Sequence, residues 1–333
     1  MNRLVSILTP CYNGEKYIRR LLDSVLSQSY PNIEMFVIDD GSTDHSAEII
    51  KSYIPAFETK GYVLNYLFQD NAGQSVAINN GLKLISGEFL IWPDCDDFFA
   101  SPKSIARMVE VLANSDDNVS MARCYAFILD ENSLEEVGRL HALAQQENQR
   151  DLFEDCLFAR NNYWFVPGNY IVKTKKIDEL IPNREIYTEK GAGQNWQLML
   201  PLLHKQQCIT IPEYLYNVVR CSNSHSRKRH KNIEKEIDKI NAYQNTLINT
   251  IHHITTISKV GKFMYEGQIE KKYDLIKYDL YLNNRRFVEA RHILDNYSAI
   301  YQKMGLKYLF YHLPYAGIMA KIWNYLLRKI KLK

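Results

Sequence analysis

Apolar runs of strand length recur at regular intervals in the first hundred residues, and this repeat constrains the fold more than any other feature. Candidate strands begin near residues 5, 34, 63 and 88, and residues with helical apolar spacing lie between them. Parallel strands need crossovers of about this length, and such crossovers are nearly always right-handed. The sequence therefore predicts an α/β fold with a Rossmann-like, mostly parallel central sheet and flanking helices.

Turn residues and apolar spacing also place the individual elements. Ser42 or Thr43 is the expected N-cap of the helix after the second strand, and Ser101 is the expected N-cap of a helix with Pro102 at its first position. Strands are expected at 5–8, 35–38, 63–68, 89–92, 121–129, 170–173, 208–211 and 215–219, and helices at 17–26, 47–54, 75–85, 195–203, 233–257, 265–282 and 287–297.

A change of composition at residues 223–230 indicates a domain boundary. This segment is polar, and the chain beyond it has helical spacing only. We therefore expect an α/β domain at residues 1–226 and a helical region at residues 227–333.

The net charge of +3 conceals an uneven distribution. Residues 296–333 contain seven Lys and Arg and no acidic residue, whereas the rest of the chain is mildly acidic. This distribution argues against a nucleic-acid partner, because such proteins carry a basic face on the body of the domain. The tail also has apolar Ile322, Trp323 and Leu326 beside its basic residues, which suits either a membrane interface or packing on the body.

The chain has no apolar stretch long enough for a transmembrane helix, and its N-terminus reads as a strand rather than as a signal peptide. The six cysteines form no C-x-x-C pair and are expected to be free thiols. We therefore expect a cytoplasmic protein, with peripheral contact at the inner membrane face if the tail binds lipid.

Acidic residues follow two of the predicted strands. Asp39 and Asp40 follow the second strand, and Asp94, Asp96 and Asp97 follow the fourth. Ligands of open parallel sheets bind at the carboxyl ends of strands, so these carboxylates should converge on one crevice. Such oxygen donors suit Mn²⁺ or Mg²⁺. Alternatively, the residues serve only as turn formers and caps.

Phosphate-binding glycine loops are absent: the sequence has neither G-x-G-x-x-G nor G-x-x-x-x-G-K-[ST]. A metal ion that bridges a diphosphate is the natural substitute.

Several motifs in chain order resemble the family 2 glycosyltransferases, which have the GT-A fold. They are VSILTPCYN at residues 5–13, SQSYPNIE at 27–34, VIDDGSTD at 37–44, NAG at 71–73, AIN at 77–79 and GEFLIWPDCDD at 87–97. The resemblance covers about the first hundred residues and continues more weakly to about residue 226. It implies transfer of a sugar from a nucleotide-sugar donor, typically UDP-linked, to an acceptor hydroxyl, usually with inversion.

The resemblance also implies site residues. Asp40 would accept a hydrogen bond from the base, Asp94 would lie near the ribose and the metal, and Asp96 or Asp97 would hold the metal. The remaining nucleotide-sugar-binding candidates are Thr9, Pro10, Tyr12, Asn13 and Asn71. For Tyr12 and Asn13 the alternative is a strand-to-helix turn and cap.

The sequence departs from the family at the expected catalytic base. The family usually supplies an Asp from a Glu-Asp pair, and the matching positions here are Gln194 and Asn195. An amide cannot act as a general base, although it can position the acceptor. The base would then be another group, with Glu189 and His225 as candidates, or the chain binds its donor without efficient transfer.

Three functions are consistent with these features. The leading hypothesis is a transferase that acts on a lipid-linked or other glycan acceptor in bacterial surface-polysaccharide synthesis. The second is a non-catalytic donor-binding partner of another glycosyltransferase. The third, a receiver-type signalling domain, leaves the acidic cluster at 94–97 without a role.

Overall fold

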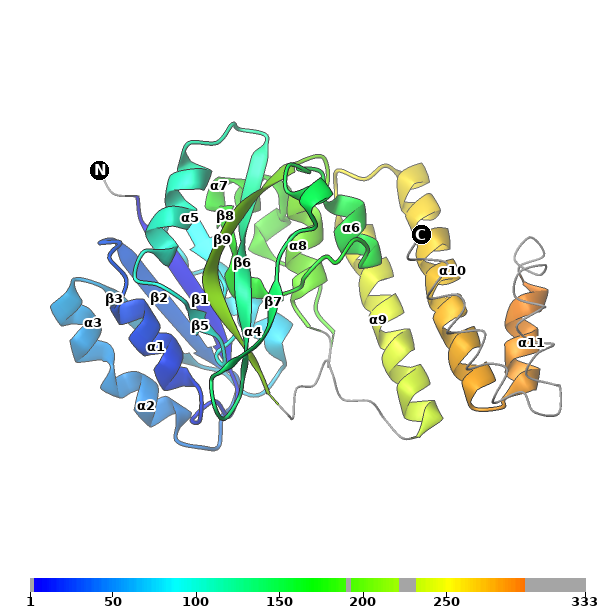
Figure 1. Cartoon of the computed structure of the whole chain (residues 1–333), viewed down its shortest axis with the longest axis horizontal. Coiled ribbons are helices and arrows are strands. Elements are labelled where there is room, and N and C mark those ends of the chain that lie inside the picture. Colours follow the sequence, from blue (N-terminus) through cyan, green and yellow to red (C-terminus); the bar gives the residue numbers. More distant parts are fainter. Residues whose placement is uncertain (1–2, 190–192, 222–231, 297–333) are drawn as a thin grey trace. The chain divides into compact units, whose positions relative to one another are not determined.

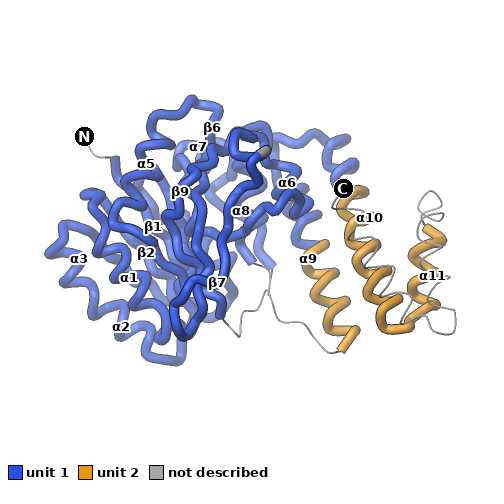
Figure 2. The backbone as a smooth tube through the Cα atoms, viewed as in Figure 1, with its two compact units in different colours: residues 1–228, 245–265 blue, residues 229–244, 266–333 orange. Residues whose placement is uncertain are grey.

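The computed structural model describes residues 3–189, 193–221 and 232–296 (Figure 1). The chain forms two compact units, which are coloured separately in Figure 2. Unit 1 comprises residues 1–228 and 245–265, and unit 2 comprises residues 229–244 and 266–333. All strands of the described residues belong to unit 1.

The first half of the sheet is parallel, as the sequence predicts. Its strands lie in the order β3-β2-β1-β4, so the chain moves outward from β1 and then returns to the other side of it. This reversal of order makes the carboxyl ends of β1 and β4 the natural ligand crevice. The four strands are β1 (Val5–Cys11), β2 (Ile33–Asp39), β3 (Val63–Phe68) and β4 (Phe89–Ile91).

The second half of the sheet is mixed. Strand β8 is antiparallel to both β4 and β6, whereas β6 and β9 run parallel. The two runs predicted at 208–211 and 215–219 form the single strand β9, because register shifts near Tyr125 let it pair with β6 across the interruption. The strands are β5 (Phe98–Phe99), β6 (Val119–Asp130), β7 (Glu136–Leu140), β8 (Tyr170–Lys173) and β9 (Gln207–Arg220).

Helices flank the sheet on both faces. Val5 and Ile7 pack in the same core as Leu21 of α1, whereas Leu8 points toward Gly81 of α4 on the opposite face. Figure 1 shows α1, α2 and α3 together on one side of the parallel strands. The helices of this part are α1 (Ile18–Leu26), α2 (Ser46–Ser52), α3 (Ile54–Lys60), α4 (Gln74–Leu82), α5 (Ser104–Ala113), α6 (Phe153–Phe158), α7 (Thr174–Leu180) and α8 (Asn195–Leu203).

Two predicted helix starts are wrong because other side chains cap these helices. Helix α5 begins at Ser104 rather than at Pro102: Ser101 Oγ accepts the Lys103 amide at 3.2 Å ahead of the helix, and the Ile105 amide donates to Gln28, just beyond α1. Helix α2 begins at Ser46, whose amide donates to Asp44. Ser42 accepts a hydrogen bond from the Asn13 amide instead.

The C-terminal helices are α9 (Ile233–His253), α10 (Lys259–Asn283) and α11 (Phe287–Asp295). Within unit 2, Tyr278 and Leu282 pack with Ala290, Ile293 and Leu294 in a small core. None of the helices in the described part of the chain has both the length and the apolar character that a membrane crossing requires. The predicted amphipathic tail lies outside the described residues.

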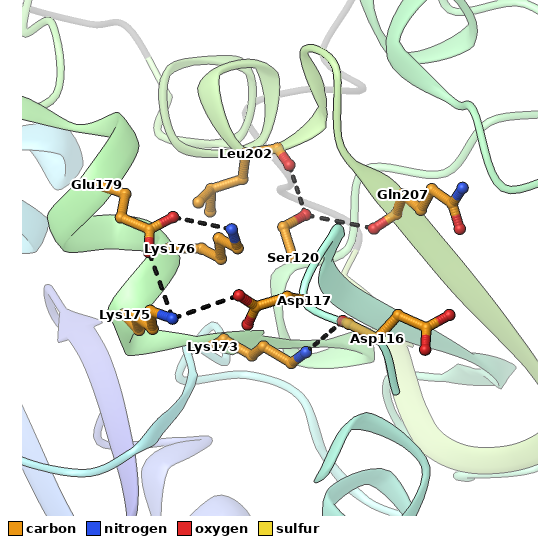
Figure 3. A network of polar contacts seen from close by, with 9 residues as sticks. All are labelled: Asp116, Asp117, Ser120, Lys173, Lys175, Lys176, Glu179, Leu202 and Gln207. Atoms are coloured by element: carbon orange, nitrogen blue, oxygen red, sulfur yellow. Dashed lines mark hydrogen bonds and ion pairs between the residues drawn. The ribbon is translucent and has the colours of Figure 1, made fainter. Parts of the chain in front are cut away.

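A polar network closes the edge of the sheet where β4 begins and β8 ends (Figure 3). Lys173 donates to the Asp116 carbonyl at 2.7 Å, and Lys176 pairs with Glu179 at 2.8 Å. Ser120 donates to the Leu202 carbonyl, which links β6 to α8. Because β4 begins at this edge, the network lies opposite the edge that carries the acidic cluster.

Replacement of Gly81 by Ala is expected to destabilise the protein. A Cβ atom at position 81 would lie 2.0 Å from Leu8 Cδ1, and Leu8 is fully buried. Overpacking of this kind costs about 1–3 kcal/mol, so chemical denaturation followed by circular dichroism should detect it.

Gly267→Ala in α10 is the matched control, because outside its own helix turn no atom of the described residues lies within 4 Å of the added Cβ. This change should be neutral or stabilising by up to ~1 kcal/mol. Equal stability of the Gly81 and Gly267 variants would contradict the packing described for α4 and β1.

Candidate functional site

The acidic cluster lies directly after β4, at the carboxyl end of the parallel strands. Oxygen atoms of Asp94, Asp96 and Asp97 all lie within 4.8 Å of one another. Burial and the nearby negative charge of Asp96 raise the pKa of Asp94. A divalent cation would relieve this repulsion, and three converging carboxylates are the hard oxygen donors that Mg²⁺ and Mn²⁺ prefer. The donor set therefore fits such a metal.

Asp97 also fixes the loop to the other half of the sheet. Its Oδ1 accepts a hydrogen bond from the Val219 amide of β9 at 2.8 Å, and the residue is 4% exposed. A buried carboxylate that accepts a backbone amide is held in one place. The same loop continues into β5, which pairs with β9.

Two glutamine side chains hold Asp94. Gln74, at the start of α4, and Gln194, just before α8, both donate to Asp94 Oδ1, at 2.8 and 3.0 Å. Position 194, where the family usually has an acid, therefore faces the acidic cluster. Gln194 is 0% exposed, and its Oε1 has no hydrogen-bond partner among the described residues.

Asn195 follows Gln194 in the sequence but has different hydrogen-bond partners. Its Nδ2 donates to the Phe165 carbonyl at 3.2 Å, and its buried Oδ1 has no hydrogen-bond partner within the described part of the chain. Glu189 accepts a hydrogen bond from the Tyr187 hydroxyl at 3.2 Å. Its segment is anchored by a pair of hydrogen bonds between Asn79 and the Ile186 backbone. His225 lies outside the described residues.

The Asp40 carboxylate is occupied by the loop that follows β3. Its oxygens accept hydrogen bonds from four donors: Gln69 Nε2, the Ala72 and Gly73 amides and Asn71 Nδ2, at 2.7, 2.8, 3.0 and 3.3 Å. A carboxylate has about four acceptor positions, so Asp40 is saturated in this structure. Asp40 therefore holds in place the loop that contains Asn71, one of the predicted site residues.

The end of β1 supplies the remaining predicted nucleotide-binding residues. Thr9 is fully buried and its Oγ1 has no hydrogen-bond partner among the residues described here, whereas Tyr12 is 53% exposed. Pro10 is buried within the strand. Asn13 adopts φ 50° and accepts a hydrogen bond from the Thr43 amide at 2.8 Å. Asn13 thus joins the loops after β1 and β2, and Tyr12 presents a free aromatic ring beside them.

Sequence reasoning missed several residues that contact the cluster. Gln74 and Val219 contact Asp94 and Asp97, and the thiol of Cys221 donates to Asp96 Oδ2 at 3.4 Å. All six cysteines are free. No local motif marks these partners, because they come from helix and strand ends that are distant in the sequence. Their signal in the sequence is their position: Gln74 directly precedes the helix predicted at 75–85, and Val219 ends the strand predicted at 215–219.

Residues 6–169 match the family described as Glycosyl transferase family 2. The N-terminal part of the chain is therefore a glycosyl transferase family 2 domain of the GT-A type, and the resemblance found in the sequence is confirmed.

Curated relatives are similar over the same part of the chain. An uncharacterized glycosyltransferase of Rickettsia typhi is 35% identical over 130 residues, which are 39% of this chain and 38% of the relative. Glycosyltransferase GlyA of Streptococcus pneumoniae is 43% identical over 94 residues, which are 28% of this chain and 13% of the relative. These matches cover well under half the length of each relative.

Solved structures confirm the fold over a longer span. The TarS 1–349 fragment of S. aureus in complex with UDP-GlcNAc has a TM-score of 0.56 at 18% identity, over 81% of this chain and 72% of that one. The mannosyltransferase PcManGT of Pyrobaculum calidifontis, in complex with GDP-Man and Mn²⁺, has a TM-score of 0.57 at 16% identity, over 98% of this chain and 81% of that one.

Asp40→Asn is expected to destabilise the loop at residues 69–73. The substituted amide nitrogen would face backbone amides that now donate to a carboxylate, and loss of hydrogen bonds to a charged group costs about 1.5–3 kcal/mol. Hydrogen exchange of the Ala72 and Gly73 amides should accelerate, and the midpoint of urea unfolding should fall.

Asp70→Asn is the control, because Asp70 is exposed in the same loop. Its effect should stay within about 0.5 kcal/mol. If the Ala72 amide exchanges its hydrogen as slowly in Asp40→Asn as in the wild type, the role given to Asp40 is contradicted.

Proposed function

We propose that this chain transfers a sugar from a UDP-linked donor to an acceptor hydroxyl, with inversion and with the help of a divalent cation. The observation that carries the proposal is the convergence of Asp94, Asp96 and Asp97 within 4.8 Å at the carboxyl edge of a family 2 domain. The donors in the two solved structures, UDP-GlcNAc and GDP-Man, are nucleotide sugars and support the substrate class.

The donor would bind across the carboxyl ends of β1, β2 and β4. Tyr12, which is 53% exposed, would offer its ring as a stacking surface for the base. The loop at residues 69–73, held by Asp40, would form the wall of the base pocket, with Thr9 and Pro10 at its floor and Asn13 and Asn71 at its sides. Asp40 would reach the base only by giving up one of its four present donors.

Asp94 and Asp96 would hold Mn²⁺ or Mg²⁺, with Asp97 as a further candidate. When bound, the cation would neutralise the charge that develops on the departing nucleoside diphosphate. Gln74 and Gln194 would keep Asp94 oriented toward this site through their hydrogen bonds to its Oδ1. A glutamate at position 194 would instead add another negative charge 3.0 Å from Asp94, which explains why an amide suits this position.

The base that accepts the proton of the acceptor hydroxyl would be Glu189 or His225. Neither Gln194 nor Asn195 can accept a proton at neutral pH. Asn195 is a candidate for positioning the acceptor, since its unpartnered Oδ1 can accept a hydrogen bond from a hydroxyl group.

The acceptor we propose is a lipid-linked or other glycan in bacterial surface-polysaccharide synthesis. The basic, amphipathic sequence near the C-terminus supports a peripheral position at the cytoplasmic face of the membrane. We also propose that residues 1–226 carry the transfer chemistry and that residues 227–333 serve attachment.

A second candidate function is donor binding without transfer, as a partner of another glycosyltransferase. The amides at positions 194 and 195 favour it, because the usual Glu-Asp pair is missing. Donor binding without sugar transfer and without donor hydrolysis would support this function against the first.

Nucleotide sugars are expected to stabilise the protein in a metal-dependent manner. A ligand at 100 times its Kd adds about 2.7 kcal/mol to stability, which a thermal-shift screen with and without Mn²⁺ should resolve. One nucleotide class should stabilise the wild type, and Asp96→Ala should lose the Mn²⁺-dependent part.

Asp116→Ala is the control, because Asp116 is exposed at the opposite edge of the sheet (Figure 3). It should retain the full stabilisation. Absence of a shift with every donor, or an unchanged shift in Asp96→Ala, would contradict the proposed donor site.

Removal of the base should reduce transfer without reducing donor binding. A positioned base contributes about 10²–10⁴-fold, so either Glu189→Gln or His225→Ala should lower kcat by that factor in a radiolabelled transfer assay with membrane extract. Donor affinity in the thermal-shift assay should be unchanged in the same variant.

Asn195→Asp serves as the companion variant, since it restores the acid that the family usually has. It should change the transfer rate little if another base operates. A large gain in this variant, with no loss in the other two, would contradict the assignment of the base to Glu189 or His225.

A further inference from the structure

Cys221 brings a thiol into direct contact with the acidic cluster. It follows β9 immediately, and its Sγ lies 3.4 Å from Asp96 Oδ2 although the two residues are 125 positions apart. The side chain is 9% exposed, and the Tyr17 hydroxyl lies within hydrogen-bonding reach of the thiol. The same hydroxyl donates to Glu131 at 2.6 Å. The thiol therefore has a fixed place beside Asp96.

We propose that Cys221 is a further ligand of the divalent cation held by Asp94 and Asp96. The inference rests on the proposed function, which places the cation at these carboxylates. Oxygen and sulfur ligands of one Zn²⁺ ion lie about 3.1–3.6 Å apart, given bond lengths of about 2.1 and 2.3 Å and angles between 90° and tetrahedral. The observed separation of 3.4 Å falls within this interval.

An unpartnered polar atom at the same cluster points independently to a bound ion. Gln194 is fully buried, and its Nε2 donates to Asp94 Oδ1 at 3.0 Å, so its carboxamide lies against the cluster. Its Oε1 has no hydrogen-bond partner among the described residues. A hydrated cation would supply a partner for this oxygen through its water ligands.

A thiolate ligand would change which metals the site prefers. On binding, the S–H bond breaks, the proton passes to solvent and the sulfur lone pair forms the bond to the metal, with no change of oxidation state. Soft sulfur donors favour thiophilic ions over Mg²⁺ and Ca²⁺. The site should therefore bind Zn²⁺ and Cd²⁺ more tightly than a site made of carboxylates alone.

Cys95 is the matched control for Cys221. It lies between Asp94 and Asp96 in the sequence, but its sulfur, like that of Cys11, lies next to Gly14. It is thus a second thiol at the same loop that lies against a different residue. Substitution of either cysteine by serine keeps a small polar side chain.

The experiment is a titration of the reduced, metal-free full-length chain with Cd²⁺ in the absence of donor. The wild type should develop the ultraviolet charge-transfer absorption of a cadmium–thiolate bond. Cys221→Ser and Cys221→Ala should lose this absorption and bind Cd²⁺ about tenfold or more weakly, a loss at least as large as that of an outer-shell partner. Cys95→Ser should keep both the absorption and the affinity.

Circular dichroism establishes that each variant is folded. The proposal is overturned if the wild type gives no absorption, if the absorption persists in both Cys221 variants, or if Cys95→Ser also removes it. Mn²⁺-dependent donor stabilisation of the wild type, measured separately, tests the proposed function. A retained donor effect without the cadmium absorption would overturn only the assignment of Cys221.

Discussion

The hydrogen bond from the Val219 amide to the Asp97 carboxylate joins the two halves of the sheet at the site. Asp97 belongs to the loop after β4, the last strand of the parallel half of the sheet, and Val219 belongs to β9, three strands further along the sheet order. With this bond in place, Asp94 and Asp96 stand close together and their negative charges oppose each other. The amides of Gln74 and Gln194 then provide the compensating dipoles.

This arrangement gives a physical reason for the departure from the usual family pattern. An acid at position 194 would point at Asp94 rather than at an acceptor, since Gln194 is fully buried and donates to that carboxylate. The Gln194 amide therefore orients Asp94, a proposed metal ligand, and does not contact the acceptor in the proposed site. In the proposed function, the acceptor side would depend on Asn195 and on a base elsewhere in the chain.

Much of the fold could be predicted because the relevant signals are local. Strand β3 and helix α8 have the predicted bounds, since apolar periodicity and turn residues mark them within a few residues. The helix starts near Ser42 and Ser101 could not be predicted in this way. At α2 the Ser46 amide donates to Asp44, a local residue that competes with Ser42, whereas at α5 the Ile105 amide donates to Gln28, which lies just beyond α1.

The sequence by itself determined the α/β class, the family and the clustering of acidic residues after two strands, because strand periodicity and short motifs are written in consecutive residues. Only the tertiary structure decided what each carboxylate contacts. Asp40 accepts four donors from one loop, Asp97 accepts the Val219 amide, and Asp96 accepts the Cys221 thiol. These partners lie far apart along the chain, and only the folded sheet brings their strand and helix ends to one edge.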